Sequence, residues 1–170
     1  MSGMEIERKF LVRDDSYKRM AKGSSHIRQG YICSGRGRTV RVHTRDDRSF
    51  LTIKGPSTSL GLSRYEFEKE ISADEAEHLF ELCEPGIIDK TRWLVDSGDH
   101  VFEVDEFHGD NEGLVIAEVE LRSETEPYVK PDFIGAEVTG DRRYYNSNLK
   151  GKGPTAPRAS PPTPPRKGGE

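Results

Sequence analysis

Charged and apolar side chains alternate with a period of two residues along seven segments of this chain. In the first, 4–12, Glu5, Glu7 and Lys9 occupy every second position. Such alternation is typical of β-strands, whose successive side chains point to opposite faces. Strands are predicted at 4–12, 26–33, 38–45, 49–54, 64–71, 87–95, 100–107 and 114–122. Their short, even spacing, with turn residues between them, predicts a mainly β (α+β) fold, an antiparallel barrel or meander.

One helix has a clear start signal. Ser72 and Glu75 form an S-x-x-E capping box, and apolar residues follow at helical spacing up to Cys83. The Pro85-Gly86 pair is expected to end this helix. Short helices are also expected near Pro131 and over roughly 141–149.

The alternation leaves two arrangements open. An open sheet with one wet face explains charge alternation in any single strand, but only one clear helix is available to cover its apolar side. A closed barrel would turn the charged faces inward, where each charge needs a partner. Acids outnumber bases there, so divalent cations would complement them, and an anion would complement the bases. All candidate ligands are carboxylates, which favour Mg²⁺ or Mn²⁺ over zinc.

Composition narrows the classes of function. Residues 151–170 are rich in Pro and Gly and predict a disordered tail, which leaves 1–150 as one domain. That tail is basic, so the domain is more acidic than the formal net charge of −4 and is expected to bind no nucleic acid. No apolar run predicts a membrane span or a secretory signal. Cys33 and Cys83 are expected to be free thiols of a cytoplasmic protein.

An ordered series of motifs resembles the CYTH superfamily, the triphosphate tunnel metalloenzymes, and especially its short bacterial members. The series runs from about residue 4 to 149. Its blocks are EIERKFLV at 5–12, RQGYI at 28–32, LTIKG at 51–55, GLSRYEFE at 61–68, DKTRW at 89–93, FEVDEF at 102–107, AEVEL at 117–121 and EVTGDRRYYN at 137–146.

This resemblance implies an eight-stranded antiparallel β-barrel tunnel with a charged lumen and a few flanking helices. The tunnel would hold a triphosphate and a divalent metal, Mg²⁺ or Mn²⁺, and cleave a phosphoanhydride bond. Metal carboxylates would be Glu5, Glu7, Glu118 and Glu120. Phosphate ligands would be Lys9, Arg41, His43, Lys54, Arg64, Arg92 and Arg143. Catalytic residues would be Lys90, Glu66 and Glu68, with Tyr31, Glu103 and Asp105 supporting the site. Arg143 and Tyr144 would lie in a C-terminal segment that closes or lines one mouth.

One departure concerns the third predicted strand, where the family often has R-x-R and this chain has Arg41-Val42-His43. Histidine is a weak phosphate ligand near neutral pH because its ordinary pKa is about 6.5. Arg45 shares the face and could compensate.

Hydrolysis of inorganic triphosphate is the favoured activity. A class IV-type adenylyl cyclase or a thiamine or nucleoside triphosphatase would need a base-binding wall, for which Tyr31 and Trp93 are the candidates. A non-catalytic module that binds polyphosphate or nucleotides is the alternative from another class. A homodimer is also left open.

Overall fold

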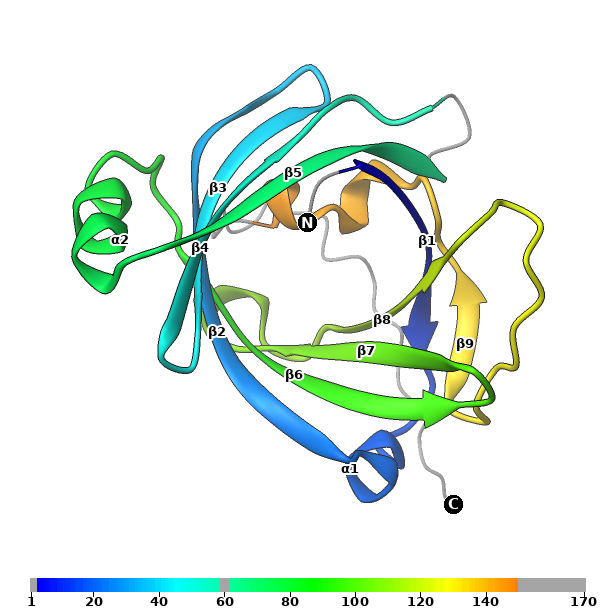
Figure 1. Ribbon diagram of the computed structural model, residues 1–170. Helices are drawn as coiled ribbons and strands as arrows, with labels where there is room; N and C mark the ends of the chain where they lie inside the picture. Colours follow the sequence, from blue (N-terminus) through cyan, green and yellow to red (C-terminus); the bar gives the residue numbers. More distant parts are fainter. Residues whose placement is uncertain (1–2, 59–61, 150–170) are drawn as a thin grey trace.

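The fold is a closed barrel of eight antiparallel strands, seen in a computed structural model that describes residues 3–58 and 62–149. The strands are β1 (Gly3–Val12), β2 (Gly23–Gly35), β3 (Arg38–Arg45), β4 (Arg48–Lys54), β5 (Ser63–Ile71), β6 (Ile88–Ser97), β7 (His100–Phe107) and β8 (Val115–Leu121). Their order around the barrel is β5-β4-β3-β2-β6-β7-β8-β1, and a β1–β5 pairing closes the ring (Figure 1). The predicted strands are confirmed, and of the two arrangements left open by the sequence the closed barrel is the one observed.

A ninth strand, β9 (Ile134–Glu137), extends the sheet beside β1. A helix was predicted near Pro131, and that prediction is wrong. Strand β5 pairs only with the first part of β1, from Gly3 to Ile6. Phe10 and Val12 are therefore free to pair with β9, and an open strand edge favours a further strand over a helix.

The prediction of a helix over 141–149 is wrong in that no single regular helix spans this segment. The segment instead forms two 3₁₀ turns, η2 (Arg142–Tyr144) and η3 (Asn146–Asn148). The side chain of Asp141 accepts a hydrogen bond from the backbone N–H of Arg143. This local bond gives the backbone an alternative to a regular helix.

The capping box at Ser72 is confirmed. Ser72 Oγ accepts from the Glu75 N–H at 3.0 Å, and Glu75 Oε1 accepts from the Ser72 N–H at 2.8 Å. Helix α2 (Ala73–Phe80) ends before Pro85 and packs outside the barrel, as does the short helix α1 (Tyr17–Met20) (Figure 1). A third 3₁₀ turn, η1 (Gly109–Asn111), follows β7.

Apolar side chains on the outer face of the barrel form one of two cores. Phe10, Phe102 and Val104 are fully buried there, and Tyr17 and Phe133 cover them from α1 and the segment before β9. Other outward-facing side chains stay uncovered, including Met4, Ile53 and Tyr65. The expected apolar exterior, partly covered and partly exposed, is confirmed.

A second apolar core fills one end of the barrel interior. Leu11, Ile88, Phe107 and Ile116 continue the inward-facing rows of their strands, because each is an even number of residues from a charged inward position. Leu149 of the C-terminal segment is fully buried against this cluster. The interior thus has an apolar end, which we call the plug, and a polar remainder.

Three further expectations concern the rest of the chain. Cys33 and Cys83 are free thiols, as predicted. Within the described residues, no helix combines the length and the apolar character that crossing a membrane requires. The predicted tail at 151–170 lies outside the described residues.

Candidate active site

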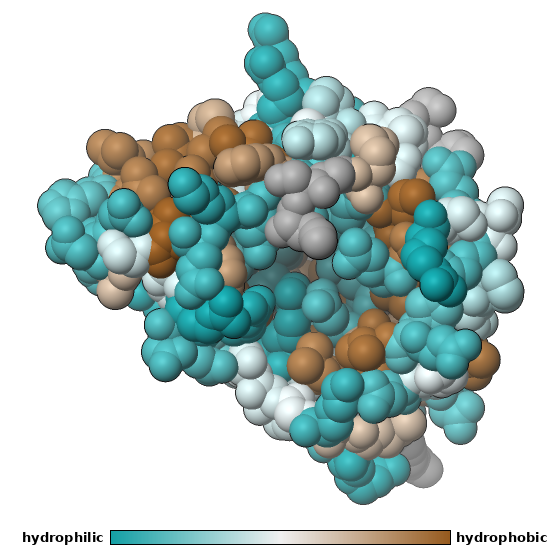
Figure 2. Space-filling view, viewed as in Figure 1, coloured by the Kyte–Doolittle hydropathy of each residue, from teal (hydrophilic) through white to brown (hydrophobic). Residues whose placement is uncertain are grey.

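The inward-facing charged rows enclose a cavity of about 450 Å³ in the polar part of the barrel. Figure 2 shows the hollow with hydrophilic side chains around it. The cavity is lined by Glu5, Glu7, Lys9, Tyr31, Thr39, Arg41, His43, Arg45, Lys54, Arg64, Glu66, Glu68, Arg92, Glu103, Glu118, Glu120, Tyr145 and Asn146. All the predicted site residues are among them except Lys90, Asp105 and Arg143.

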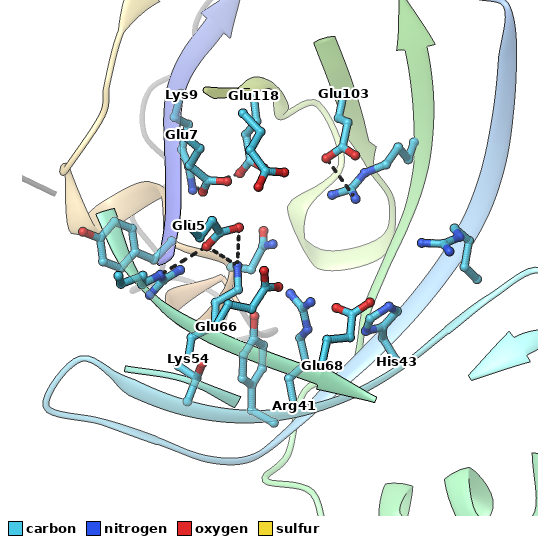
Figure 3. Close-up of a pocket in the computed structure, with 18 residues that line it drawn as sticks. Glu5, Glu7, Lys9, Arg41, His43, Lys54, Glu66, Glu68, Glu103 and Glu118 are labelled. Atoms are coloured by element: carbon cyan, nitrogen blue, oxygen red, sulfur yellow. Dashed lines mark hydrogen bonds and ion pairs between the residues drawn. The ribbon is translucent and has the colours of Figure 1, made fainter. Parts of the chain in front are cut away.

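Two basic side chains meet Glu5 at the seam between β1 and β5 (Figure 3). Lys54 Nζ lies 3.1 Å from Glu5 Oε1, and Arg64 Nε lies 3.7 Å from the same oxygen. Burial would raise the pKa of Glu5, but the charge of Lys54 and its hydrogen bond outweigh burial and lower that pKa. Glu5 is therefore a carboxylate held by internal cations.

A second group of charges lies along β1 and β8, where the strand register sets Lys9 beside Glu118 and Glu7 beside Glu120. Lys9 Nζ lies 3.2 Å from Glu118 Oε2. Burial raises the pKa of Glu7 to about 8, helped by the charges of Glu118 and Glu5. Burial also raises the pKa of Glu120, which keeps some exposure. This wall thus crowds the carboxyl groups of Glu7, Glu118 and Glu120 around one lysine, Lys9.

Lys90 lies behind the cavity wall, not in it. Its side chain is 1% exposed, and its Nζ lies 2.7 Å from Asp105 Oδ2. Arg92 also grips Asp105, through Nε at 2.8 Å and Nη2 at 2.9 Å. Burial lowers the pKa of Lys90 to about 8, whereas the two cations lower the pKa of Asp105 against the effect of burial. Lys90 and Asp105 thus fix the position of Arg92.

The wall formed by β3 has the opposite character. Arg41 and Arg45 line the cavity, and among the described residues neither has an acidic partner within ion-pair distance. His43 lies between them on the same face. Figure 3 shows Arg41 and His43 on the side of the cavity away from Glu7 and Glu118. The wall formed by β3 therefore carries cations without ion-pair partners, and Glu66 and Glu68 of β5 lie on the same side of the cavity (Figure 3).

The C-terminal segment reaches the cavity with residues other than those predicted. Arg143 is exposed and pairs with Asp141 at 2.8 Å, so its side chain does not line the cavity. Tyr144 is buried in the plug. The next residue, Tyr145, lines the cavity, and Lys9 Nζ lies 5.4 Å from the centre of its ring. The C-terminal segment thus lines the cavity through Tyr145 and Asn146, and its irregular turns give no period from which these inward residues could be read.

Trp93 was a candidate for a base-binding wall, and the structure places it outside the barrel. Its ring packs edge-on against Tyr17, and its indole N–H donates to Glu106. Trp93 is offset by one residue from Arg92, which faces inward, and so belongs to the opposite face of β6.

Comparison with known proteins decides the family. A profile of the CYTH domain matches residues 3–147. The chain belongs to the CYTH domain family. This CYTH domain is 52% identical over 148 residues to an inorganic triphosphatase of Acetivibrio thermocellus, a match covering 86% of this chain and 93% of the relative. It is 35% identical over 152 residues to an inorganic triphosphatase of Nitrosomonas europaea, covering 85% of this chain and 95% of the relative.

A solved structure supports the same assignment. The crystal structure of the inorganic triphosphatase NE1496 superposes with a TM-score of 0.59 at 31% identity, over 86% of this chain and 93% of that chain. The CYTH domain seen here therefore matches these relatives over nearly their full length.

Proposed function

We propose that the protein hydrolyses inorganic triphosphate at a phosphoanhydride bond inside the cavity. The charges that line the cavity carry this proposal, because the unpaired arginines on β3 suit phosphate oxygens and the crowded acids on β1 and β8 suit cations. The relatives named as inorganic triphosphatases support it across the whole domain.

Phosphate oxygens would be bound by Lys9, Arg41, Lys54, Arg64 and Arg92, which reach the cavity from five strands. Phosphoryl transfer needs positioning and charge neutralisation more than covalent help from the protein. Lys54 and Lys9 are already paired with Glu5 and Glu118. An entering triphosphate would therefore compete with these carboxylates for the lysines.

The acids fit a divalent cation. Among the described residues, no three side chains of His, Cys, Asp or Glu already converge as a finished metal centre. However, burial and the charges of Glu118 and Glu5 raise the pKa of Glu7 to about 8, so a cation that took the place of its proton would relieve the crowding of these carboxyl groups. Glu5, Glu7, Glu118 and Glu120 would hold Mg²⁺ or Mn²⁺, with oxygens of the substrate as further ligands. The ion would supply charge neutralisation of the phosphate oxygens.

Two residues on β5 are suited to orient the attacking water. Glu66 and Glu68 line the cavity, and Glu68 Oε1 accepts a hydrogen bond from Thr52 at 3.0 Å. Burial and the charge of Glu5 raise the pKa of Glu66, which favours its acting as a proton acceptor. Lys90, which is buried behind Arg92, would act as a positioning residue by holding Asp105 and, through it, Arg92.

The alternative activities have less support. The cavity lining includes two aromatic side chains, Tyr31 and Tyr145, and Trp93 faces outward, so a base would find few stacking partners. A cyclase or a thiamine triphosphatase is thus less favoured than a triphosphatase. A non-catalytic polyphosphate-binding module would leave the acids of β1 and β8 without a role.

A substrate panel tests the proposal. Phosphate release from inorganic triphosphate, ATP and thiamine triphosphate is measured with Mg²⁺, Mn²⁺ or Ca²⁺. Inorganic triphosphate is expected to be cleaved fastest, and Glu118→Gln to lose activity by about 100-fold or more. Lys54→Gln, in the cavity, is compared with Lys22→Gln, whose exposed partner is Asp96. Triphosphate binding without turnover under any metal would instead favour the binding module.

A cytoplasmic location, a homodimer and the absence of nucleic-acid or membrane partners stay predictions. Size-exclusion chromatography with light scattering would measure the oligomeric state.

A further inference from the structure

His43 occupies the middle of the cation-rich wall, where arginine was expected. The residue is 5% exposed, and its ring stacks on Phe50 of β4 with centroids 5.1 Å apart and planes 21° apart. Among the described residues, His43 Nδ1 has no hydrogen-bond partner. Because His43 lines the cavity, a bound ligand or a water molecule could complete its hydrogen bonding.

Four cations face His43. Arg41 and Arg45 lie two residues away on β3, and Lys90 and Arg92 face it from β6. Burial and these four charges lower the pKa of His43 to about 2. The imidazole is therefore neutral when the cavity is empty.

The acids on the other surrounding strands have partners of their own, although Glu68 of β5 lies on the same side of the cavity as His43 (Figure 3). Asp105 of β7 is already held by Lys90 and Arg92. Glu68 of β5 accepts from Thr52, and Glu70 pairs with the exposed Arg48, which also lies over the Phe50 ring. The inward-facing groups nearest to His43 on the two neighbouring strands are uncharged: Phe50 and Thr52 on β4 and Gln29 on β2.

We propose that His43 takes up a proton when a phosphate group of the substrate reaches this wall, so that it becomes a cationic phosphate ligand only while the anion is bound. The proton comes from solvent and joins the lone pair of one ring nitrogen, after which both nitrogens are hydrogen-bond donors. No bond of the phosphate changes in this step, and the proton returns to solvent when the anion leaves. The inference rests on the proposed function only in taking a polyphosphate as the ligand.

The electrostatic reason is the balance of charge around the ring. A permanent cation at this position would add to the repulsion among Arg41, Arg45, Lys90 and Arg92 in the empty protein. An entering polyanion cancels that repulsion, and a nearby opposite charge favours the protonated imidazole. Histidine thus supplies the charge at the moment when it becomes favourable.

Counting protons during binding tests the proposal. The ligand is the imido-bridged analogue of triphosphate, whose P–N–P links resist hydrolysis, with Mg²⁺. Isothermal titration calorimetry in buffers of different ionisation enthalpy, at about pH 6.5, gives the number of protons taken up. Wild type is expected to take up about one proton more than His43→Gln. Lys90, Glu7 and the ligand itself titrate in both proteins, so the difference isolates His43.

His43→Arg serves as the matched charged variant. It should bind the analogue with the same proton count as His43→Gln. Its affinity should also vary with pH less steeply than that of wild type, which gains up to about tenfold per pH unit of acidification from this one linked proton. Circular dichroism checks that each variant is folded.

Histidine ring NMR provides a second readout in the unaltered protein. The ring signal that is lost in His43→Gln identifies His43, and its shift should change from neutral to cationic when the analogue is added. Equal proton counts in wild type and His43→Gln, a ring signal that stays neutral, or no binding of the analogue would each overturn the proposal. Triphosphate hydrolysis without proton uptake would overturn this inference alone, and proton uptake without hydrolysis would overturn only the catalytic function.

Discussion

Replacing Asp105 by Asn should be among the most destabilising single changes in the barrel wall. Asp105 is 3% exposed, and it pairs with Lys90 Nζ at 2.7 Å and with Arg92 Nε at 2.8 Å. Removing one partner of a buried ion pair costs about 3–5 kcal/mol because the remaining charges are left uncompensated. For a domain of this size, about 2–4 °C per kcal/mol gives a fall in Tm of roughly 6–20 °C.

The pH dependence of this loss adds a sharper test. The pKa of Lys90 is about 8 in the folded protein, below its ordinary value, because burial disfavours its charge. Without Asp105 that pKa should fall further, so Lys90 can shed its proton and limit the cost. The loss in free energy of unfolding caused by Asp105→Asn should therefore become smaller between about pH 7 and 9, because the wild type also begins to lose the Lys90 charge there.

Urea unfolding followed by circular dichroism at several pH values measures the deficit. Asp96→Asn is the matched control, because Asp96 pairs with Lys22 at 2.9 Å on the exposed surface and should cost no more than about 1 kcal/mol. Equal losses in the two variants would refute the view that Asp105 compensates two buried cations.

Three further predictions concern other parts of the chain. The raised pKa of Glu7, about 8, means that the folded protein binds more protons than the unfolded chain between about pH 4.5 and 8, so stability falls as pH rises through this window. Without divalent cations, Glu7→Gln should therefore gain in Tm relative to wild type from about pH 5 to 8, and a constant difference would contradict the raised pKa. Leu149→Ala should lose about 2–5 kcal/mol in urea unfolding, because Leu149 is fully buried in the plug; a loss below about 1 kcal/mol would mean that the C-terminal segment does not anchor there. Ser72→Ala should cost about 1 kcal/mol through the lost cap of α2, whereas Ser72→Asp, which keeps a capping oxygen, should cost little by the same assay.

The strands of the barrel and their inward faces could be predicted because the alternation that marks them lies within each strand's own sequence. Charges at every second residue define inward faces without knowledge of any partner strand, and residues such as Glu5, Lys54 and Glu118 line the cavity as expected. The family resemblance supplied what alternation left open, the closure of the sheet. Strand β9 escaped prediction because its pairing with β1 depends on where β5 departs, which is a tertiary property.

The site residues that were misplaced share a different cause. The alternation predicts which face of the strand a side chain lies on, but not whether it reaches the cavity. Lys90 and Arg92 were therefore both predicted to line the cavity, although Lys90 lies behind its wall. Tyr145 and Arg143 lie in turns with no period, and their places follow from how Tyr144 and Leu149 enter the plug. Trp93 was predicted from its chemistry alone, against the alternation that places it on the outer face.

The first strand closes the barrel, so the barrel cannot be completed early in folding. The β1–β5 junction joins segments about sixty positions apart, and β1–β8 joins segments more than a hundred apart. Such long-range strand pairings form slowly because the chain loses much conformational entropy before the stabilising contacts between the strands are made. During synthesis the cavity that binds phosphate would stay incomplete until β8 had been made. The ability to bind phosphate should therefore appear in one late step of folding.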